Sequence, residues 1–468
     1  MPRKEGLQDT ADGVSEQDSE LKALMQAVEA KKPEAMAELG YRYENGTGVP
    51  ASLERAAELY QQSADMSNAV GLYRLGMLYM QGLGVSRDLR RATNLIRSAA
   101  EKGFAEAQCA YGNSILGRNR AEAFSWFKKA AEQGHAEAQE RLSKCYCDGL
   151  GVATDLEQGL RWLRLSAEQG NVVALTRLGF MYDYGKGVEE DRYKGFQLYM
   201  KAAQQGHAGA QYNVGLSYWN AEGVERDEVE GFKWVLKAAE QGHVNACLSV
   251  GLSYFTGRGV EQDFETAFRW FMTIENDSRA EFRLGQAYLD GLGVPIDKRK
   301  AFEYFRSAAM KSHIDAMYNV ARCYQVGIGC QPNIESAARF LQAAARARHA
   351  DACYKMAIEY AKTDKDINMY LICACEKGHP DANYTLGLRF RDGTGLPAPS
   401  IDQAIKYFDA AQQRGHYEAM YELALLYDRP EKKDTFGSEV ESLMRKAADG
   451  GCKRALQWLL ENADFELY

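Results

Sequence analysis

The stretch FKKAAEQGHAEAQ runs from Phe127 to Gln139, and a near copy, VLKAAEQGHVNAC, runs from Val235 to Cys247. Both place a Gly-His pair directly after a glutamate and a glutamine. A unique Glu-Gly-His cluster would be a candidate reaction centre, because each residue type serves in catalysis or in a tight turn. These copies belong to a longer pattern, so the repeat has to be established before any chemistry is assigned.

A leucine-like residue followed by a small residue recurs through the chain, mostly at a spacing of 36 residues. We number this leucine-like residue position 7 of its unit. Positions 3 and 8 are small in every unit, and position 11 is aromatic except at Ile115. These positions share one helical face, so the pattern predicts a helix A whose small residues admit a close partner helix. The position 7 residues are Leu39, Leu75, Tyr111, Leu142, Leu178, Val214, Val250, Leu284, Val320, Met356, Leu386 and Leu423.

A glycine-rich turn and a second helix, helix B, follow helix A in most units. Gly suits the residue after a helix, where φ is positive, as in the Gly82-Leu-Gly84 turn. Helix B is amphipathic, for example EAFSWFKKAAEQG from Glu122 to Gly134. The expected N-caps of helix B are Asp88, Asp155, Asp191, Asp227, Asp263, Asp297 and Asn333. One slot of helix B, expected in the core, contains Trp126, Trp162, Trp234 and Trp270.

A single helical hairpin cannot bury both of its faces, so the units must stack. We therefore predict an all-α fold, a right-handed α-solenoid (superhelix) of about twelve stacked αα-hairpin repeats of ~36 residues. Residues 1–20 are expected to be a disordered polar tail, and residues 21–32 an N-terminal capping helix. Residues 33–452 form the predicted solenoid. Residues 453–468 are the predicted C-terminal capping helix and tail, with Trp458, Leu459 and Leu460 covering the last repeat.

The repeat resembles that of the Sel-one-like repeat family, a relative of the tetratricopeptide repeat. The shared elements are Ala-x-x-x-Leu-Gly-x-x-Tyr, Gly-x-Gly-Val-x-x-Asp and Ala-x-x-Trp-Phe-x-x-Ala-Ala-Glu-x-Gly, and they cover about residues 33–452. The resemblance implies a non-enzymatic scaffold or adaptor that binds a protein or peptide partner on its inner curved surface. It also implies an alternative function as a bacterial toxin-immunity or host-interaction effector protein.

A third function, β-lactam binding or hydrolysis, is implied by a cysteine-rich secreted subgroup of the same family. That subgroup places paired cysteines at fixed points of each repeat. In this chain no repeat position holds cysteine more than twice, so its pattern departs from the subgroup. The ten cysteines, which include Cys145, Cys147, Cys373 and Cys375, lack zinc-site spacing and are expected to be reduced thiols.

Composition excludes several other classes of protein. The net charge is −8, from 57 basic and 65 acidic residues, which does not favour nucleic-acid binding. The N-terminus lacks the apolar segment of a signal peptide, and no apolar run is long enough to span a membrane. A cytoplasmic location is therefore expected, with a translocated effector as the alternative. The sequence does not indicate the oligomeric state.

The residues that look reactive all occupy repeated positions. Seven histidines end the turn from helix B to the next helix A, and a shared turn position argues against a catalytic base. The Gly-x-Gly motifs follow helices, whereas a dinucleotide fingerprint follows a strand. We expect no catalytic residue, no metal site and no cofactor. The histidines are His135, His207, His243, His313, His349, His379 and His416.

By analogy with tetratricopeptide repeats, positions 5, 9 and 12 of helix A face the inner surface. These positions are most apolar in units five to eight, so we predict a partner-binding groove there. The alternative is that neighbouring A helices bury the same side chains. The predicted groove residues are Phe180, Tyr212, Leu216, Trp219, Leu248, Leu252, Phe255 and Phe282. Units three, seven, ten and twelve have irregular turns that should change the local pitch.

Overall fold

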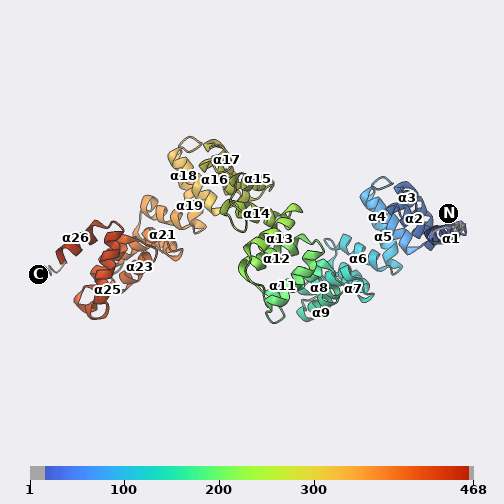
Figure 1. The fold of residues 1–468 in the computed structure, drawn as a ribbon, viewed down its shortest axis with the longest axis horizontal. Helices are drawn as coiled ribbons and strands as arrows, with labels where there is room; N and C mark the ends of the chain where they lie inside the picture. The colour runs from blue at the N-terminus through green and yellow to red at the C-terminus, as the bar shows by residue number, and fades with distance from the viewer. Residues whose placement is uncertain (1–15, 463–468) are drawn as a thin grey trace, which may run out of the picture. The chain divides into compact units, whose positions relative to one another are not determined.

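The computed structural model describes residues 16–462, which fold into helices α1 to α26 and one π-helical turn, η1, with no strand in this range. Contacts within the chain define two units, Met1–His243 and Val244–Tyr468. Consecutive helices form antiparallel pairs in each unit (Figure 1).

The first unit contains thirteen helices in its described part. They are α1 (Glu16–Glu29), α2 (Pro33–Asn45), α3 (Leu53–Asp65), α4 (Ala69–Gln81), α5 (Leu89–Glu101), α6 (Ala105–Ile115), α7 (Arg120–Glu132), α8 (Ala136–Asp148), α9 (Leu156–Glu168), α10 (Val172–Asp183), α11 (Arg192–Gln204), α12 (Ala208–Asn220) and α13 (Glu228–Glu240).

The second unit continues the series with its own helices and the π-helical turn. They are α14 (Val244–Thr256), α15 (Phe264–Met272), α16 (Ser278–Asp290), α17 (Lys298–Met310), α18 (Ile314–Val326), α19 (Ile334–Arg346), α20 (Ala350–Lys355), η1 (Met356–Tyr360), α21 (Asp364–Glu376), α22 (Pro380–Asp392), α23 (Ile401–Gln412), α24 (Tyr417–Tyr427), α25 (Pro430–Asp449) and α26 (Lys453–Asn462).

The helices from α2 to α25 pair as twelve A–B hairpins, so the predicted α-solenoid is confirmed. Within a hairpin, a buried side chain of helix B lies over the position 8 glycine of helix A. A Cβ at Gly112 would lie 2.7 Å from the ring of Phe127, which is fully buried. Gly179 and Tyr199 form the same pair in the fifth repeat. The small residue therefore lets the two helices approach closely and places the aromatic ring in the core.

The helix-B tryptophans are less buried than the sequence predicted. Trp126, Trp162, Trp234 and Trp270 are all partly exposed, one residue before the buried aromatic or aliphatic side chain of the same helix. Lys129 Nζ lies 4.2 Å from the ring centroid of Trp126, and Lys237 Nζ lies 4.0 Å from that of Trp234. At this position on the edge of helix B, one face of the tryptophan ring packs toward the core, and the other face can contact a cation.

All seven predicted N-caps of helix B are confirmed. The Asp155 carboxylate, for example, accepts a hydrogen bond of 3.0 Å from the backbone N–H of Gln158. Asn333 does the same at the start of α19, with its side-chain oxygen 2.8 Å from Ser336 N. These bonds satisfy backbone donors that have no partner inside the helix.

The second glycine of each Gly-x-Gly turn serves packing between repeats. Gly149 and Gly151 both have positive φ, of 68° and 80°. A Cβ on Gly151 would overlap the carbonyl oxygen of Arg120, the first residue of α7 in the preceding repeat. The turn after each helix A therefore rests directly on the backbone of the previous helix B.

The N-terminal helix is longer than predicted. Helix α1 begins at Glu16, so residues 16–20, expected in the polar tail, are helical. Leu21, Leu24 and Val28 of this helix pack against the first core cluster. The remaining part of the predicted tail, residues 1–15, lies outside the described residues.

At the other end, α26 covers the last repeat with two of its three predicted residues. Trp458 and Leu459 pack against the final core cluster, whereas Leu460 is 69% exposed. The prediction that Leu460 covers the last repeat is wrong, because this residue lies on the outer face of a helix only three turns long. The end of the predicted C-terminal tail, residues 463–468, lies outside the described range.

Candidate protein-interaction surface

The histidines that end the B-to-A turns cap the A helices. His207 Nδ1 accepts a hydrogen bond of 3.1 Å from the backbone N–H of Ala210, at the start of α12. An Nδ1 atom that accepts this bond carries no proton, so the ring is neutral. The sequence predicted a turn residue at this position but not the cap. The same bond is formed by His135, His313, His349, His379 and His416.

The same imidazole rings join one repeat to the next. Position 5 of helix A packs its aromatic ring against the histidine of the following repeat, as in Phe282 and His313, whose centroids lie 4.6 Å apart. Burial lowers the pKa of His207, His243, His313 and His379. Position 5 is therefore occupied by contacts within the chain. The other stacked pairs are Tyr212–His243, Tyr318–His349, Tyr354–His379 and Tyr384–His416, at 4.5–4.9 Å.

Four of the eight predicted groove residues lie in the first unit. Phe180 on α10 is 39% exposed, and Trp219 on α12 is only 5% exposed. Tyr212 and Leu216, also on α12, are partly buried. Their exposure therefore differs by position, with position 9 the most accessible.

Trp219 is a core residue, which corrects its predicted place in an exposed patch. Its Nε1 donates a hydrogen bond of 3.1 Å to the carbonyl oxygen of Glu228 at the start of α13. Its ring lies against Gly231, where a Cβ would come within 2.5 Å of the ring. Other repeats have alanine at this slot, for example Ala123 and Ala267. The glycine in helix B makes the space that buries the tryptophan.

The other four predicted residues lie in the second unit, and two of them are buried. Leu248 and Phe282 are each 7% exposed, so they do not belong to an exposed groove. Leu252 and Phe255 on α14 are partly buried. The Phe255 ring packs edge-on against Phe264 with a centroid separation of 5.3 Å. Contacts inside the unit therefore use most of these side chains.

Val173 and Phe180 of α10, together with Tyr184, the residue that follows the helix, form a ridge that the sequence pattern predicted only in part. We define these three residues as the α10 ridge, and they are 41%, 39% and 60% exposed. A spacing of seven residues places Val173 and Phe180 on one helical face, and Tyr184 lies beside Phe180 at the end of the helix. The Phe180 and Tyr184 ring centroids lie 4.6 Å apart, and Lys186 Nζ lies 4.6 Å from the Phe180 centroid. This cluster offers a partner an aromatic surface with a cation beside it.

A partly buried ion pair fixes the base of the ridge. Arg177, between Val173 and Phe180 on α10, places its guanidinium 2.6 Å from the carboxylate of Glu140 on α8. Glu140 is 3% exposed and the Arg177 side chain is partly exposed, and their bond links two A helices. The ridge therefore projects from a helix that is held firmly against its neighbour.

The model of the Sel1 repeat family matches the chain in ten stretches that together cover most of its length. They are residues 33–68, 69–104, 105–135, 136–171, 172–207, 208–243, 244–271, 278–313, 314–349 and 380–416. The chain belongs to the Sel1 repeat family.

Solved structures agree with this assignment. A protective antigen from uropathogenic Escherichia coli with an SLR fold is 25% identical, with a TM-score of 0.70, and the match covers 93% of this chain and 97% of that one. A Sel1 repeat protein from Oxalobacter formigenes is 30% identical over 63% of this chain and 87% of its own, with a TM-score of 0.47. An immunity protein from Pseudomonas aeruginosa is 23% identical over 44% and 82%, with a TM-score of 0.33.

Two hairpins outside the ten matched Sel1 repeats keep the architecture with altered turns. The tenth hairpin ends its helix A in the π-helical turn η1 and lacks the Gly-x-Gly motif. The twelfth pairs α24 with the 20-residue helix α25. At the eighth Sel1 repeat, Asp277 caps α16 in place of histidine, with its carboxylate 3.2 Å from Ala280 N. Asp and His can both accept this bond, so the cap survives the change of residue.

The thiols of these repeats are buried or partly buried. No disulfide joins the ten cysteines, all of which lie in the described range. Burial raises the pKa of Cys109 and Cys375 to about 12 and that of Cys145 and Cys323 to about 11. Such thiols stay protonated at neutral pH and are poor nucleophiles.

Neither a metal-binding cluster nor a membrane-spanning helix occurs in the described part of the chain. There, no three side chains of His, Cys, Asp or Glu lie together as a possible metal site. None of the helices described combines the length and the apolar character that crossing a membrane requires.

Proposed function

We propose that this Sel1 repeat protein is a non-enzymatic scaffold that binds a protein partner through its A-helix face, with the α10 ridge as the main contact. The observation that carries the proposal is the exposure of Val173, Phe180 and Tyr184 as a group on one face of α10 and at its end. Adjacent exposed aromatic and aliphatic residues are typical of protein interfaces, because their burial against a partner is favourable.

The proposed surface modifies the groove predicted from the sequence. Phe180 is its centre, and the partly buried Tyr212 and Leu216 on α12 extend it. Leu252 and Phe255 remain proposed contacts of the second unit. Trp219, Leu248 and Phe282 are left out because their side chains are buried.

The scaffold role is supported by the way the reactive side chains are used. Six histidines use Nδ1 as the acceptor of a helix cap, and burial lowers the pKa of three of them, His207, His313 and His379. A general base needs a free nitrogen that faces a substrate. The caps and the raised thiol pKa values favour binding over catalysis.

The test is site-specific photo-crosslinking in a lysate of the source cells. Tyr184 is replaced by p-benzoylphenylalanine, and Tyr193 on α11 is the matched control, because the two tyrosines are 60% and 62% exposed in the same repeat. We expect a discrete crosslinked protein from position 184 that is absent from position 193. Adding Phe180→Ala should reduce that crosslink at least several-fold. Equal crosslinking at both positions, or no effect of Phe180→Ala, would contradict the proposal.

A further inference from the structure

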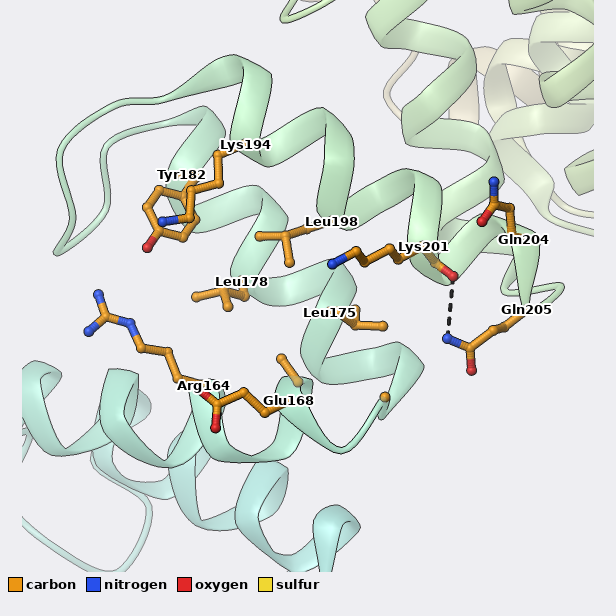
Figure 2. Close-up of a pocket in the computed structure, with 12 residues that line it drawn as sticks. Arg164, Glu168, Leu175, Leu178, Tyr182, Lys194, Leu198, Lys201, Gln204 and Gln205 are labelled. Atoms are coloured by element: carbon orange, nitrogen blue, oxygen red, sulfur yellow. Dashed lines mark hydrogen bonds between the residues drawn. The ribbon is translucent and has the colours of Figure 1, made fainter.

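A hollow of about 820 Å³ lies on the opposite side of α10 from the ridge. Figure 2 shows Arg164 and Glu168 of α9 on one wall and Lys194, Leu198 and Lys201 of α11 on the other. Leu175, Leu178 and Tyr182 of α10 line its floor. We call this hollow the α9–α11 groove. Leu178 and Phe180 lie two residues apart on a helix, about 200° around its axis, so the groove and the ridge are separate surfaces.

One lining residue of the groove is leucine where the flanking repeats have an aromatic residue. Leu198 occupies the slot that holds Trp162 and Trp234 in those repeats. The smaller side chain leaves open space that a tryptophan ring fills in the flanking repeats. Leu160 on α9 likewise occupies the slot of Phe124 and Phe196, but it does not line the groove.

Tyr182 has leucine where the tyrosines of the neighbouring repeats have phenylalanine. In those repeats, Phe124 packs edge-on against Tyr146 and Phe196 against Tyr218, with centroid separations of 5.4 and 5.5 Å. Tyr182 occupies the same position, with Leu160 at the phenylalanine slot, and, like the rings of Tyr146 and Tyr218, its ring is partly exposed. Lys194 Nζ lies 4.3 Å from its centroid. A hydrogen bond from Lys194, together with Arg164, lowers the pKa of the Tyr182 phenol.

Lys194 adds a positive charge to the groove. Its slot holds an acid in two other repeats, Glu122 and Glu230, and a base in three, Arg55, Arg91 and Lys300. Lys201 corresponds to Lys129 and Lys237, which lie over tryptophan rings, but its own slot has Leu198 beneath it.

The basic side chains of the groove are open to an incoming ligand. Among the residues that the structure describes, Arg164, Lys194 and Lys201 form no ion pair with a carboxylate, and all three are exposed. Glu168, the one acid in the lining, is not within ion-pairing distance of them. The groove therefore presents three unneutralised cations in a chain of net charge −8.

We propose that the α9–α11 groove binds an acidic peptide segment of a partner protein. Its carboxylates pair with Arg164, Lys194 and Lys201, and one apolar side chain of the segment lies on Leu175, Leu178 and Leu198. The volume suits a short segment with one large side chain. Charge complementarity selects the ligand, and the leucine floor adds apolar burial.

A peptide fits these features better than a nucleic acid does. Phosphate-backbone binding relies on an extended basic surface, and this groove has three cations beside an acidic residue. A leucine floor offers a phosphate neither a charge nor a hydrogen-bond donor, but it can pack against an aliphatic side chain. The inference deepens the proposed scaffold function by giving a second surface and the chemistry of its partner.

Fluorescence anisotropy tests the proposal with the full-length protein. The probe is a fluorescein-labelled peptide with a central leucine between two runs of glutamate. We expect saturable binding that weakens as salt is added. Lys194→Glu introduces the acid that Glu230 supplies in the following repeat, and Leu198→Trp introduces the tryptophan of both flanking repeats, so both variants should fold. Each should weaken binding at least about tenfold.

The matched control is Lys237→Glu, which reverses a charge at the Lys201 slot of the next repeat and should leave affinity within about twofold. A probe with glutamine in place of glutamate should bind poorly. Equal affinity for both probes, insensitivity to Leu198→Trp, or no saturation by about 1 mM would overturn the proposal. Tighter binding of single-stranded RNA or of phosphatidylserine vesicles with the same variant pattern would also overturn it.

The two proposals can fail separately. The variant with Phe180→Ala and Tyr184→Ala keeps the groove residues, so it should bind the acidic peptide normally. Loss of the ridge crosslink with retained peptide binding identifies the groove as an independent site. If Leu198→Trp loses peptide binding but keeps the crosslink at position 184, the ridge binds its partner independently of the groove.

Discussion

Phe180 and Trp219 are aromatic residues of successive A helices, and the difference between them lies in the helix that each one faces. The Trp219 ring fills the space above Gly231 and donates to a backbone carbonyl, whereas the Phe180 ring lies beside Tyr184 at the surface. Trp219 therefore contributes to packing of the core, whereas Phe180 is accessible to a partner.

We expect Trp219→Ala to destabilise the first unit by about 3–5 kcal/mol, because it leaves a cavity next to Gly231 and removes a buried hydrogen bond. Phe180→Ala should change stability by no more than about 1 kcal/mol, since its ring is partly exposed. Urea unfolding followed by helical circular dichroism checks both. Similar unfolding midpoints for the two variants would show that Trp219 is not a core residue.

The burial of Trp219 could be predicted from the sequence only by considering the facing positions of helix A and helix B together. Positions 5, 9 and 12 of helix A were assigned to the inner surface from an analogy that treats each helix alone. Burial depends on the partner slot in helix B, where glycine at residue 231 replaces alanine. The stacking of position 5 on the next histidine was missed for a similar reason, since it joins residues about 31 apart.

The elements themselves follow closely from the sequence. Helix A, the glycine turn, the Asp or Asn cap and helix B appear in the predicted order, because local rules decide each of them. Histidine capping was not anticipated, because histidine is an uncommon N-cap and its Nδ1 accepts only when neutral. Leu198 differs in the sequence from the tryptophans of the flanking repeats, but only the structure shows that it lines one hollow together with Lys194.

Capping should matter measurably at the level of one helix. Asp155→Ala removes the acceptor for Gln158 N–H and should cost about 1 kcal/mol of unfolding free energy. Asp155→Asn should keep most of the stability, as Asn333 does in its own repeat. Glu157→Ala, at an exposed site in the same first turn, is the control. Thermal melts of the three variants check the order, and an Asp155→Ala variant as stable as Glu157→Ala would contradict it.

The two kinds of glycine turn should respond differently to alanine. Gly134 has a φ of 89°, and a methyl group added there would meet nothing within 4 Å, so Gly134→Ala should cost about 1–2 kcal/mol from backbone strain alone. Gly151→Ala adds an overlap with the Arg120 carbonyl and should cost clearly more. Comparison of the urea midpoints checks this difference, and equal midpoints would mean that the turn does not rest on the preceding repeat.

At the scale of the whole molecule, the two units of the chain use the same kind of contact between successive repeats. The repeat spacing is unbroken from Val214 to Val250, so the division at His243 has no counterpart in the sequence pattern. It arises from the distribution of contacts along the described chain. Each unit nevertheless uses the same caps, glycine turns and histidine stacks.

The buried histidines of both units should make stability depend on pH. Burial lowers the folded-state pKa of His207, His243, His313 and His379 below 6.5, so the unfolded chain takes up protons first as the pH falls. At His379, Asp351 opposes this shift but does not reverse it. Stability should be full above pH 7 and fall as the pH drops through 6.5 and below. Protonation at Nδ1 would also remove the cap acceptor.

Urea midpoints at pH 8.5, 7.5 and 5.5 check the pH prediction. We expect the first two to agree, as far as the histidines are concerned, and the last to be lower. Replacing His207 and His313 by Asn, which can cap but does not titrate in this range, should reduce the drop. An unchanged drop in that variant would assign the acid sensitivity to other groups.

The joint formed by a histidine and the aromatic residue one repeat earlier also bears on how such chains change in evolution. All parts of a joint lie within about one repeat length, so recombination that gains or loses a whole unit in phase brings a histidine back against a suitable partner. An array can therefore change length without a new core. Differences between a repeat and its neighbours, such as Leu198 between Trp162 and Trp234, are not shared by every copy and are lost when that copy is lost. The fold is therefore maintained by features that all repeats share, whereas the binding preference depends on residues of individual repeats.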